Sequence, residues 1–204
     1  MLSAMRAMSV FLSFIFLGSV LAQVAPTPTK ADPPALPVID YNACPFEGCT
    51  FGEWTVAKDT PLFDSWKPGR AAQGKLSKGE KVTGLTGVHI TNKPDAIRVL
   101  ADIPQLSLKR GDTIFRYMYV GEGFADIWAN GKWMKETDCT FIVEKDSSGC
   151  QRDCKAEVIE EGNKEWWVQV RTKSGLVAWA KADDNFEGMD SLGSVMRRGP
   201  AQGF

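Results

Sequence analysis

The sequence predicts an all-β protein, and three observations support this prediction. Short segments in which apolar and polar residues alternate recur along the chain, and turn-forming residues separate them. Sustained helical periodicity is missing after the N-terminal apolar run, and only residues 155–161 allow a short helical turn. Five cysteines fit an oxidising compartment, where small β-domains often add covalent links to a modest core.

Residues 1–22 have the pattern of a secretory signal peptide. Arg6 is the only charge in this segment, residues 10–21 are apolar, and small residues precede a cleavage site after Ala22. The apolar run is shorter than the roughly 20 residues that span a bilayer. We therefore predict an exported protein, periplasmic or extracellular, with no membrane insertion once the signal is removed.

Two further segments are predicted to lack packed structure. Residues 23–43 are rich in proline, which favours an extended, solvated linker. Residues 187–204 are predicted to form a flexible C-terminal tail. Ordered structure should therefore begin near Cys44, in segments such as 52–57, 60–63 and 78–85 that have the composition of strands.

Two β-hairpins are predicted in the second half of the chain. Asn130-Gly131 lies between two alternating segments, and both residue types tolerate the positive φ of a type I′ turn. Residues 166–179 alternate on either side of a turn that contains Gly175. Since strand side chains alternate between faces, one of Trp166 and Trp167 should lie in the core and the other should be half exposed.

A short pattern occurs twice. Leu76-Ser-Lys-Gly-Glu-Lys-Val and Leu106-Ser-Leu-Lys-Arg-Gly-Asp-Thr-Ile each place a basic residue, a glycine and an acid before a β-branched strand. This pattern, and the hairpin that ends at Trp179, resemble the central turn and last strands of bacterial SH3-like (SH3b) domains.

The resemblance implies one or two small SH3-like β-barrels. In tandem, they would span residues 44–102 and 103–186, with a loop inserted at 138–163, and the first would be degenerate because it lacks the tryptophan-containing ending. Alternatively, residues 52–87 and 165–182 form one barrel and the middle of the chain is inserted into it.

The cysteine spacing predicts a local disulfide and leaves the other pairing open. Cys44 and Cys49 bracket a turn-like segment, and a bridge between them is expected. One further bridge is expected within the trio Cys139, Cys150 and Cys154. No metal site is predicted, because no paired histidines accompany these cysteines and exported thiols tend to oxidise.

Charge and motifs exclude several classes of function. The chain has 24 basic and 25 acidic residues, so it has no field that would attract nucleic acid or anionic lipid. It contains no phosphate loop or other cofactor motif, and no cofactor is predicted. His89 is the only histidine, no nucleophile motif accompanies it, and alternation places it on a strand or loop surface.

A small carboxylate-dependent hydrolase is an alternative that needs no motif. The acids considered for it are Glu122, Asp126, Asp183, Asp184, Glu187 and Asp190. We interpret them as solvated turn and tail residues, because small β-barrels leave little room for a deep cleft.

The aromatic content carries the functional prediction. Seven tryptophans, three tyrosines and eleven phenylalanines are more than two small cores need. The candidate ligand-binding residues are Trp167, then Tyr117, Tyr119, Trp128 and Trp133. We predict a non-catalytic binding module that recognises cell-wall peptide or glycan, or an envelope protein, through aromatic grooves. The alternative is an interaction scaffold whose aromatic surface is buried by an obligate partner, and the sequence leaves the oligomeric state open.

Overall fold

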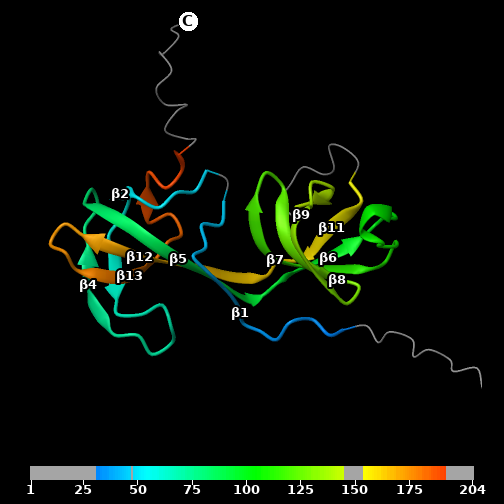
Figure 1. Ribbon diagram of the computed structural model, residues 1–204, viewed down its shortest axis with the longest axis horizontal. Helices are drawn as coiled ribbons and strands as arrows, with labels where there is room; N and C mark the ends of the chain where they lie inside the picture. The colour runs from blue at the N-terminus through cyan, green and yellow to red at the C-terminus, as the bar shows by residue number, and fades with distance from the viewer. Residues whose placement is uncertain (1–30, 47, 145–153, 192–204) are drawn as a thin grey trace, which may run out of the picture.

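The computed structural model describes residues 31–46, 48–144 and 154–191, and confirms an all-β fold in this part of the chain. The strands form two curled sheets that lie side by side as two lobes (Figure 1). The helical element among the described residues is a single 3-10 turn, Pro104–Leu106. Residues Ala156–Glu160 form a strand, so the helical turn considered for 155–161 does not occur.

The first lobe contains the 8-stranded sheet. Its strands, in spatial order, are β14 (Phe186–Glu187), β2 (Glu53–Val56), β5 (Lys81–Lys93), β12 (Asn163–Thr172), β13 (Val177–Lys181), β3 (Thr60–Phe63) and β4 (Ala72–Leu76), with β1 (Val38–Tyr41) paired to β5. The second lobe contains the 6-stranded sheet. Its order is β10 (Ile142–Val143), β11 (Ala156–Glu160), β6 (Asp95–Val99), β7 (Thr113–Gly121), β8 (Phe124–Ala129) and β9 (Lys132–Asp138).

The second lobe is inserted into the first. The chain leaves the first sheet at the end of β5 and returns along β12, and these two strands pair antiparallel from Thr172 to Asn163. Strand pairing therefore follows the interpretation in which residues 52–87 and 165–182 share one sheet. It differs from a sequential division into 44–102 and 103–186, because the first sheet is completed by a distant segment rather than a local one. Residues 138–163, predicted as a loop, include β10 and β11.

Both predicted unstructured segments are partly ordered. Residues Val38–Tyr41 pair with β5, and the side chain of Ala43 is buried, so the linker prediction is wrong for these positions. At the other end, β14 pairs with β2, and Ser191 donates its backbone N–H to the carbonyl of Gly48 at 2.8 Å. The tail prediction is therefore wrong for residues 187–191. Residues 1–30 and 192–204, including the predicted signal peptide, lie outside the described residues.

Each lobe has its own core, and the two cores differ in composition. The first lobe buries Trp54 and Phe186 among small and branched aliphatic residues. The second lobe buries mainly isoleucine, valine and alanine, with Phe141 at one side. A third cluster, Val88, Ile90 and Trp167, lies on the other face of the first sheet.

The repeated sequence pattern forms the same turn in both lobes. Gly79 and Gly111 have φ of 87° and 91°, a left-handed conformation that glycine adopts without strain. Gly79 donates its backbone N–H to Val56 at 2.8 Å, and Gly111 donates to Val99 at 2.8 Å. Each turn leads into the next strand of its sheet, β5 or β7, so the repeat is structural as well as sequential.

The two predicted hairpins are confirmed. β12 pairs with β13 across the turn that contains Gly175, and β8 pairs with β9 across Asn130-Gly131. Asn130 and Gly131 have φ of 51° and 78°, as a type I′ turn requires.

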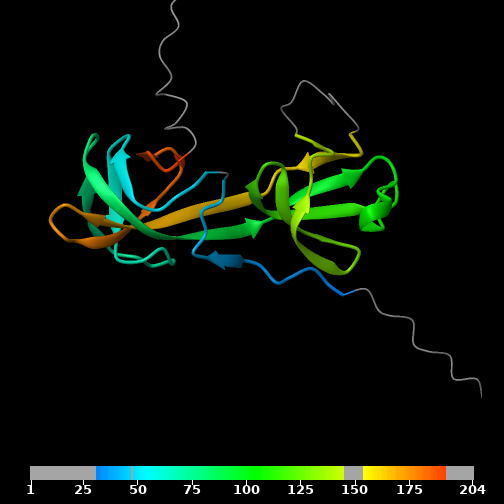
Figure 2. The same ribbon diagram turned by 45° about the horizontal axis from the view of Figure 1, so that its top comes forward.

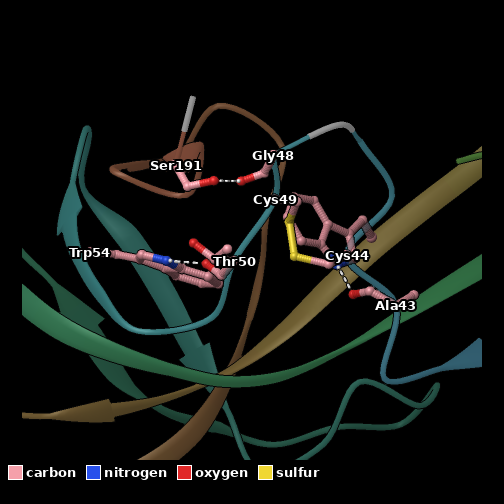
Figure 3. The surroundings of a disulfide bond; sticks show 8 residues. Ala43, Cys44, Gly48, Cys49, Thr50, Trp54 and Ser191 are labelled. Atoms are coloured by element: carbon pink, nitrogen blue, oxygen red, sulfur yellow. Dashed lines mark hydrogen bonds between the residues drawn. A yellow bond between two sulfur atoms is a disulfide. The ribbon is translucent and has the colours of Figure 1, made fainter. Parts of the chain in front are cut away.

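The Cys44–Cys49 disulfide is confirmed and closes a small ring beside the first lobe (Figure 3). Around the ring, the Trp166 indole donates to the carbonyl of Ala43 at 3.1 Å and the Trp54 indole donates to that of Thr50 at 3.0 Å. Cys139 is a free, buried thiol, and burial raises its pKa to about 12. Cys154 is disulfide-bonded, and Cys150 lies outside the described residues.

Candidate functional site

The candidate functional site lies where the two lobes meet. In the first sheet, Asp40 of β1, His89 of β5 and Trp166 of β12 are direct cross-strand neighbours, so their side chains share one face. The second lobe approaches this face through β7. Figure 2 shows β1 lying against β5 near the junction of the lobes.

Two hollows lie on either side of His89, and together we call them the junction groove. The first has a cavity volume of about 250 Å³ and is lined by Val38, Ile39, Asp40, His89, Thr91, Tyr117, Met118, Asp126, Trp133 and Lys135. The second has a volume of about 260 Å³ and is lined by His89, Pro45, Tyr119, Lys164, Glu165, Trp166 and Asp183. Both lobes therefore supply walls to the groove.

His89 forms the partition between the hollows and is only 7% exposed. Burial, with a smaller contribution from the positive charge of Lys164, lowers the pKa of His89 to about 4. The ring is therefore neutral near pH 7, with one N–H donor and one acceptor nitrogen. Neither nitrogen has a hydrogen-bond partner among the described residues, and neither is fully buried, because no fully buried side-chain nitrogen or oxygen there lacks a partner. The prediction of a surface histidine is wrong, because β1 and β12 flank this residue and β7 lies across it.

Tyr117 is a second buried polar residue in the groove. Its side chain is 2% exposed, burial raises the pKa of its hydroxyl, and that hydroxyl has no hydrogen-bond partner in the described part of the chain. Its ring lies 4.7 Å from that of Trp133. The residue is fixed in place because Thr91 donates its hydroxyl to the Tyr117 backbone carbonyl at 2.8 Å.

Two carboxyl groups border the first hollow. Asp126 is 7% exposed and accepts a hydrogen bond from the backbone N–H of Glu136 at 2.9 Å. Asp40 is half-buried; burial raises its pKa, the charge of Asp126 adds to this, and Lys135 opposes it. Neither carboxylate has a cation within ion-pair distance among the described residues.

Asp95 holds the lobes together beside the groove. Its carboxylate accepts hydrogen bonds from Arg116 at 2.7 Å, Lys164 at 2.5 Å and the backbone N–H of Gly162 at 2.8 Å. Burial alone would raise its pKa, but these partners outweigh burial and hold the pKa of Asp95 below its usual value. Because the partners come from β7, β12 and the turn before β12, the groove walls are anchored to one another.

Most of the predicted aromatic residues gather on one side of the second lobe. Trp128 and Trp133 are cross-strand neighbours, and Tyr117 contacts Trp133. Tyr117 and Trp133 line the first hollow, and Tyr119 lines the second. Trp128 packs against Phe115 at 6.0 Å and lines neither hollow.

Trp167, the leading candidate from the sequence, does not lie in the groove. It is 2% exposed on the opposite face of β12, where its ring packs edge-on against Phe63 at 5.8 Å. The guanidinium of Arg70 lies 4.1 Å from the ring centroid. The expectation that one tryptophan of the pair is core and the other partly exposed is correct, with Trp167 in the core and Trp166 partly exposed, but Trp167 is covered because β3 and the following loop fold over that face.

The other acidic candidates lie apart from one another. Glu122 borders a separate open hollow, Asp183 lies at the rim of the groove, and Asp184 is exposed and pairs with Lys58 at 3.2 Å. Glu187 and Asp190 are exposed near the end of the described chain. A further hollow of about 770 Å³ lies between β5 and the β12–β13 turn, but its polar lining consists of exposed or half-buried side chains.

Sequence reasoning did not name Asp40, Lys135 or Lys164, and it placed His89 on the surface rather than in the groove. Among the described residues, no group of three or more His, Cys, Asp or Glu side chains is arranged to hold a metal ion. The described part of the chain likewise contains no helix long and apolar enough to cross a membrane. Comparison with models of protein families, with curated proteins and with solved structures found no match.

Proposed function

We propose that this protein is an exported, non-catalytic binding protein that takes a peptide or glycan segment of the cell envelope into the junction groove. The observation that carries the proposal is the pair His89 and Tyr117. Both side chains are buried, both lack a hydrogen-bond partner among the described residues, and both border the same cavity of about 250 Å³.

The polar groups that border this cavity favour a ligand at this position. No fully buried side-chain nitrogen or oxygen of the described residues lacks a partner, so the unpartnered polar atoms of His89 and Tyr117 are accessible to a ligand, and a hydrogen bond to a ligand is worth about 0.5–1.5 kcal/mol. Trp133 and Tyr119 add aromatic surface, which suits sugar rings and peptide bonds. The two hollows are each about 250–260 Å³, a size that suits a short segment or a single side chain.

The location of the partner follows from the predicted export. The signal-peptide pattern at residues 1–22 directs the chain out of the cytoplasm. The Cys44–Cys49 disulfide is consistent with an oxidising compartment. Envelope polymers would be accessible to an exported protein.

The test is co-sedimentation of residues 23–204, produced in an oxidising compartment, with purified cell-wall sacculi. We expect saturable binding that Tyr117→Phe weakens by roughly five- to tenfold, the usual worth of one hydrogen bond. Tyr41→Phe is the matched control, because it removes the same hydroxyl from an exposed residue outside the groove. A folded protein that does not sediment with sacculi would overturn the wall ligand and direct the search to envelope proteins.

A carboxylate-dependent hydrolase is a second candidate, and one observation favours it. Asp40 and Asp126 border the same cavity, and the raised pKa of Asp40 suits a general acid with a second carboxyl group beside it. This candidate predicts that incubation with sacculi releases soluble fragments and that Asp126→Asn abolishes the release. Binding without release supports the binding protein instead.

A further inference from the structure

The first hollow holds the buried Asp126 and the half-buried Asp40, and both lack the cation partners that Asp95, the other buried acid of the described residues, has. Asp95, which is equally buried, is paired with Arg116 and Lys164. Asp126 has only the backbone N–H of Glu136, and Asp40 has no hydrogen bond or ion pair among the described residues. Burial of a carboxylate without a cation is costly, so the environment of Asp126 favours the arrival of one.

The remaining groups of the hollow do not balance this charge. Lys135 is the one cation in its lining, and it lies beyond ion-pair distance of both carboxylates. His89 is neutral near pH 7 because burial lowers its pKa to about 4. The lining of this cavity of about 250 Å³ therefore holds two acidic side chains, Asp40 and Asp126, against one basic side chain, Lys135.

The uncharged walls suit an organic cation. The rings of Tyr117 and Trp133 lie 4.7 Å apart at one side of the hollow, and aromatic faces attract ammonium groups. Tyr117 and His89 also offer an unoccupied hydroxyl oxygen and an acceptor nitrogen. An ammonium group carries three donors, which the carboxylates and these neutral acceptors can receive together.

We propose that the first hollow of the junction groove binds a primary ammonium group carried on the ligand, held by Asp126 and Asp40 against the Tyr117 and Trp133 rings. This inference rests on the proposed binding function and names the chemistry of the ligand. The ammonium group comes either from a free amine of a cell-wall peptide or from a lysine side chain of an envelope protein, and the experiment separates these two sources.

The first arm uses a small probe in place of the polymer. Nα-acetyl-L-lysine methylamide is titrated into the full exported chain, with binding read by calorimetry and by the NMR shift of the Trp133 indole. The Nε-acetylated form of the probe is the ligand control, because it keeps the length and loses the charge. We expect weak, saturable binding of the first probe and at least roughly tenfold weaker binding of the second, since one charge-assisted hydrogen bond is worth that much.

The variants assign the effect to the carboxylates. Asp126→Asn keeps the acceptor for the Glu136 N–H and removes the charge, and we expect it to weaken binding of the lysine probe by roughly tenfold or more. Asp40→Asn, at a half-buried position, gives the same test if Asp126→Asn does not fold. Asp184→Asn is the matched control, since it removes one carboxylate from an exposed site outside the groove.

The second arm repeats the sacculi experiment with sacculi whose free amines have been acetylated. Loss of sedimentation after acetylation supports an ammonium group supplied by the wall. Probe binding without any sacculus binding supports the ammonium site and assigns its source to a protein. Sacculus binding that is unchanged by acetylation and by Asp126→Asn overturns the ammonium site but leaves the binding function intact. Failure of both probe and sacculi to bind overturns both proposals.

Discussion

The two lobes share a turn but differ in how their sheets are completed. In each lobe, a turn glycine with positive φ donates its backbone N–H to the carbonyl at the end of an earlier strand, Val56 of β2 in the first lobe and Val99 of β6 in the second. The second lobe then builds its sheet mostly from neighbouring hairpins, whereas the first lobe needs β12, β13 and β14 from the far end of the chain. Local turn chemistry is repeated, and long-range pairing decides how each core closes.

The largest expected effect tests the aromatic core of the first lobe. Trp54 is 1% exposed, and its ring lies so close to β5 that a Cβ at Gly84 would be 2.5 Å from it. We expect Trp54→Ala to lower the free energy of unfolding by about 4 kcal/mol, as for other buried aromatic truncations. Urea denaturation measures this loss. The comparison variant in the second lobe is Ile114→Ala, expected to cost about 3 kcal/mol. If each variant lowers the hydrogen-exchange protection of both lobes equally, the two cores are not separate.

The next prediction concerns the contact that joins the lobes. Asp95→Asn removes a buried charge that Lys164 and Arg116 share, and we expect a loss of about 3 kcal/mol because these cations remain partly buried. Thermal unfolding followed by NMR would locate the loss. If the lobes depend on this contact, their transitions separate in the variant. Asp102→Asn, an exposed acid paired with Lys109, is the control, and a similar loss there would rule out a special role for the junction.

The third prediction concerns pH at the junction. The pKa of His89 is about 4 in the folded protein, against about 6.5 for a free histidine, so the unfolded chain takes up the proton more readily. The contribution of His89 to the free energy of unfolding is therefore fully present above pH 6.5. It is lost as the pH falls toward 4, by up to about 3 kcal/mol. His89→Gln should remove this part of the pH dependence. Denaturation of both proteins at a series of pH values from 7 to 4 isolates this contribution. If the free energy of unfolding changes with pH in the same way in both proteins, the buried, neutral histidine is contradicted.

The smallest expected effect tests the Cys44–Cys49 disulfide of the first lobe. Replacing both Cys44 and Cys49 with alanine opens a ring with a sequence separation of 5, and we expect a loss of about 2 kcal/mol. Hydrogen exchange should show the loss around β2 and β14, with the second lobe unchanged. Loss of protection in β7 and β8 instead would mean that the ring supports the whole molecule.

Local features of the fold were predictable from sequence. Asn130-Gly131 and Gly175 fix their hairpins through backbone conformations that few other residues adopt, and the repeated glycine pattern marks the same turn twice. The division into lobes was not predictable in the same way. Pairing of β12 with β5 depends on contacts between residues 70 or more positions apart, and no local pattern records such a partner.

Residues of the candidate site were predictable only where the pattern within a single strand was sufficient. Tyr117 and Trp133 were named from aromatic content and alternation, and both line the groove. His89 alternates with Val88 and Ile90, but only the second lobe, lying across that face, turns it from a surface residue into a buried one. Trp167 was misplaced for a related reason: both faces of β12 are covered, so alternation identified the two faces without showing that each has a neighbour.

The insertion of one lobe within the other sets an order for synthesis of the chain. Residues up to the end of β5 emerge first, yet their partners in β12–β14 follow only after the whole second lobe has been made. Until then, one edge of β5 has no partner strand, and an unpaired edge can associate with other chains. The second lobe, whose contacts are nearer in sequence, can fold in this interval. A released chain that ends at residue 162 is then expected to hold a finished second lobe beside an open half of the first.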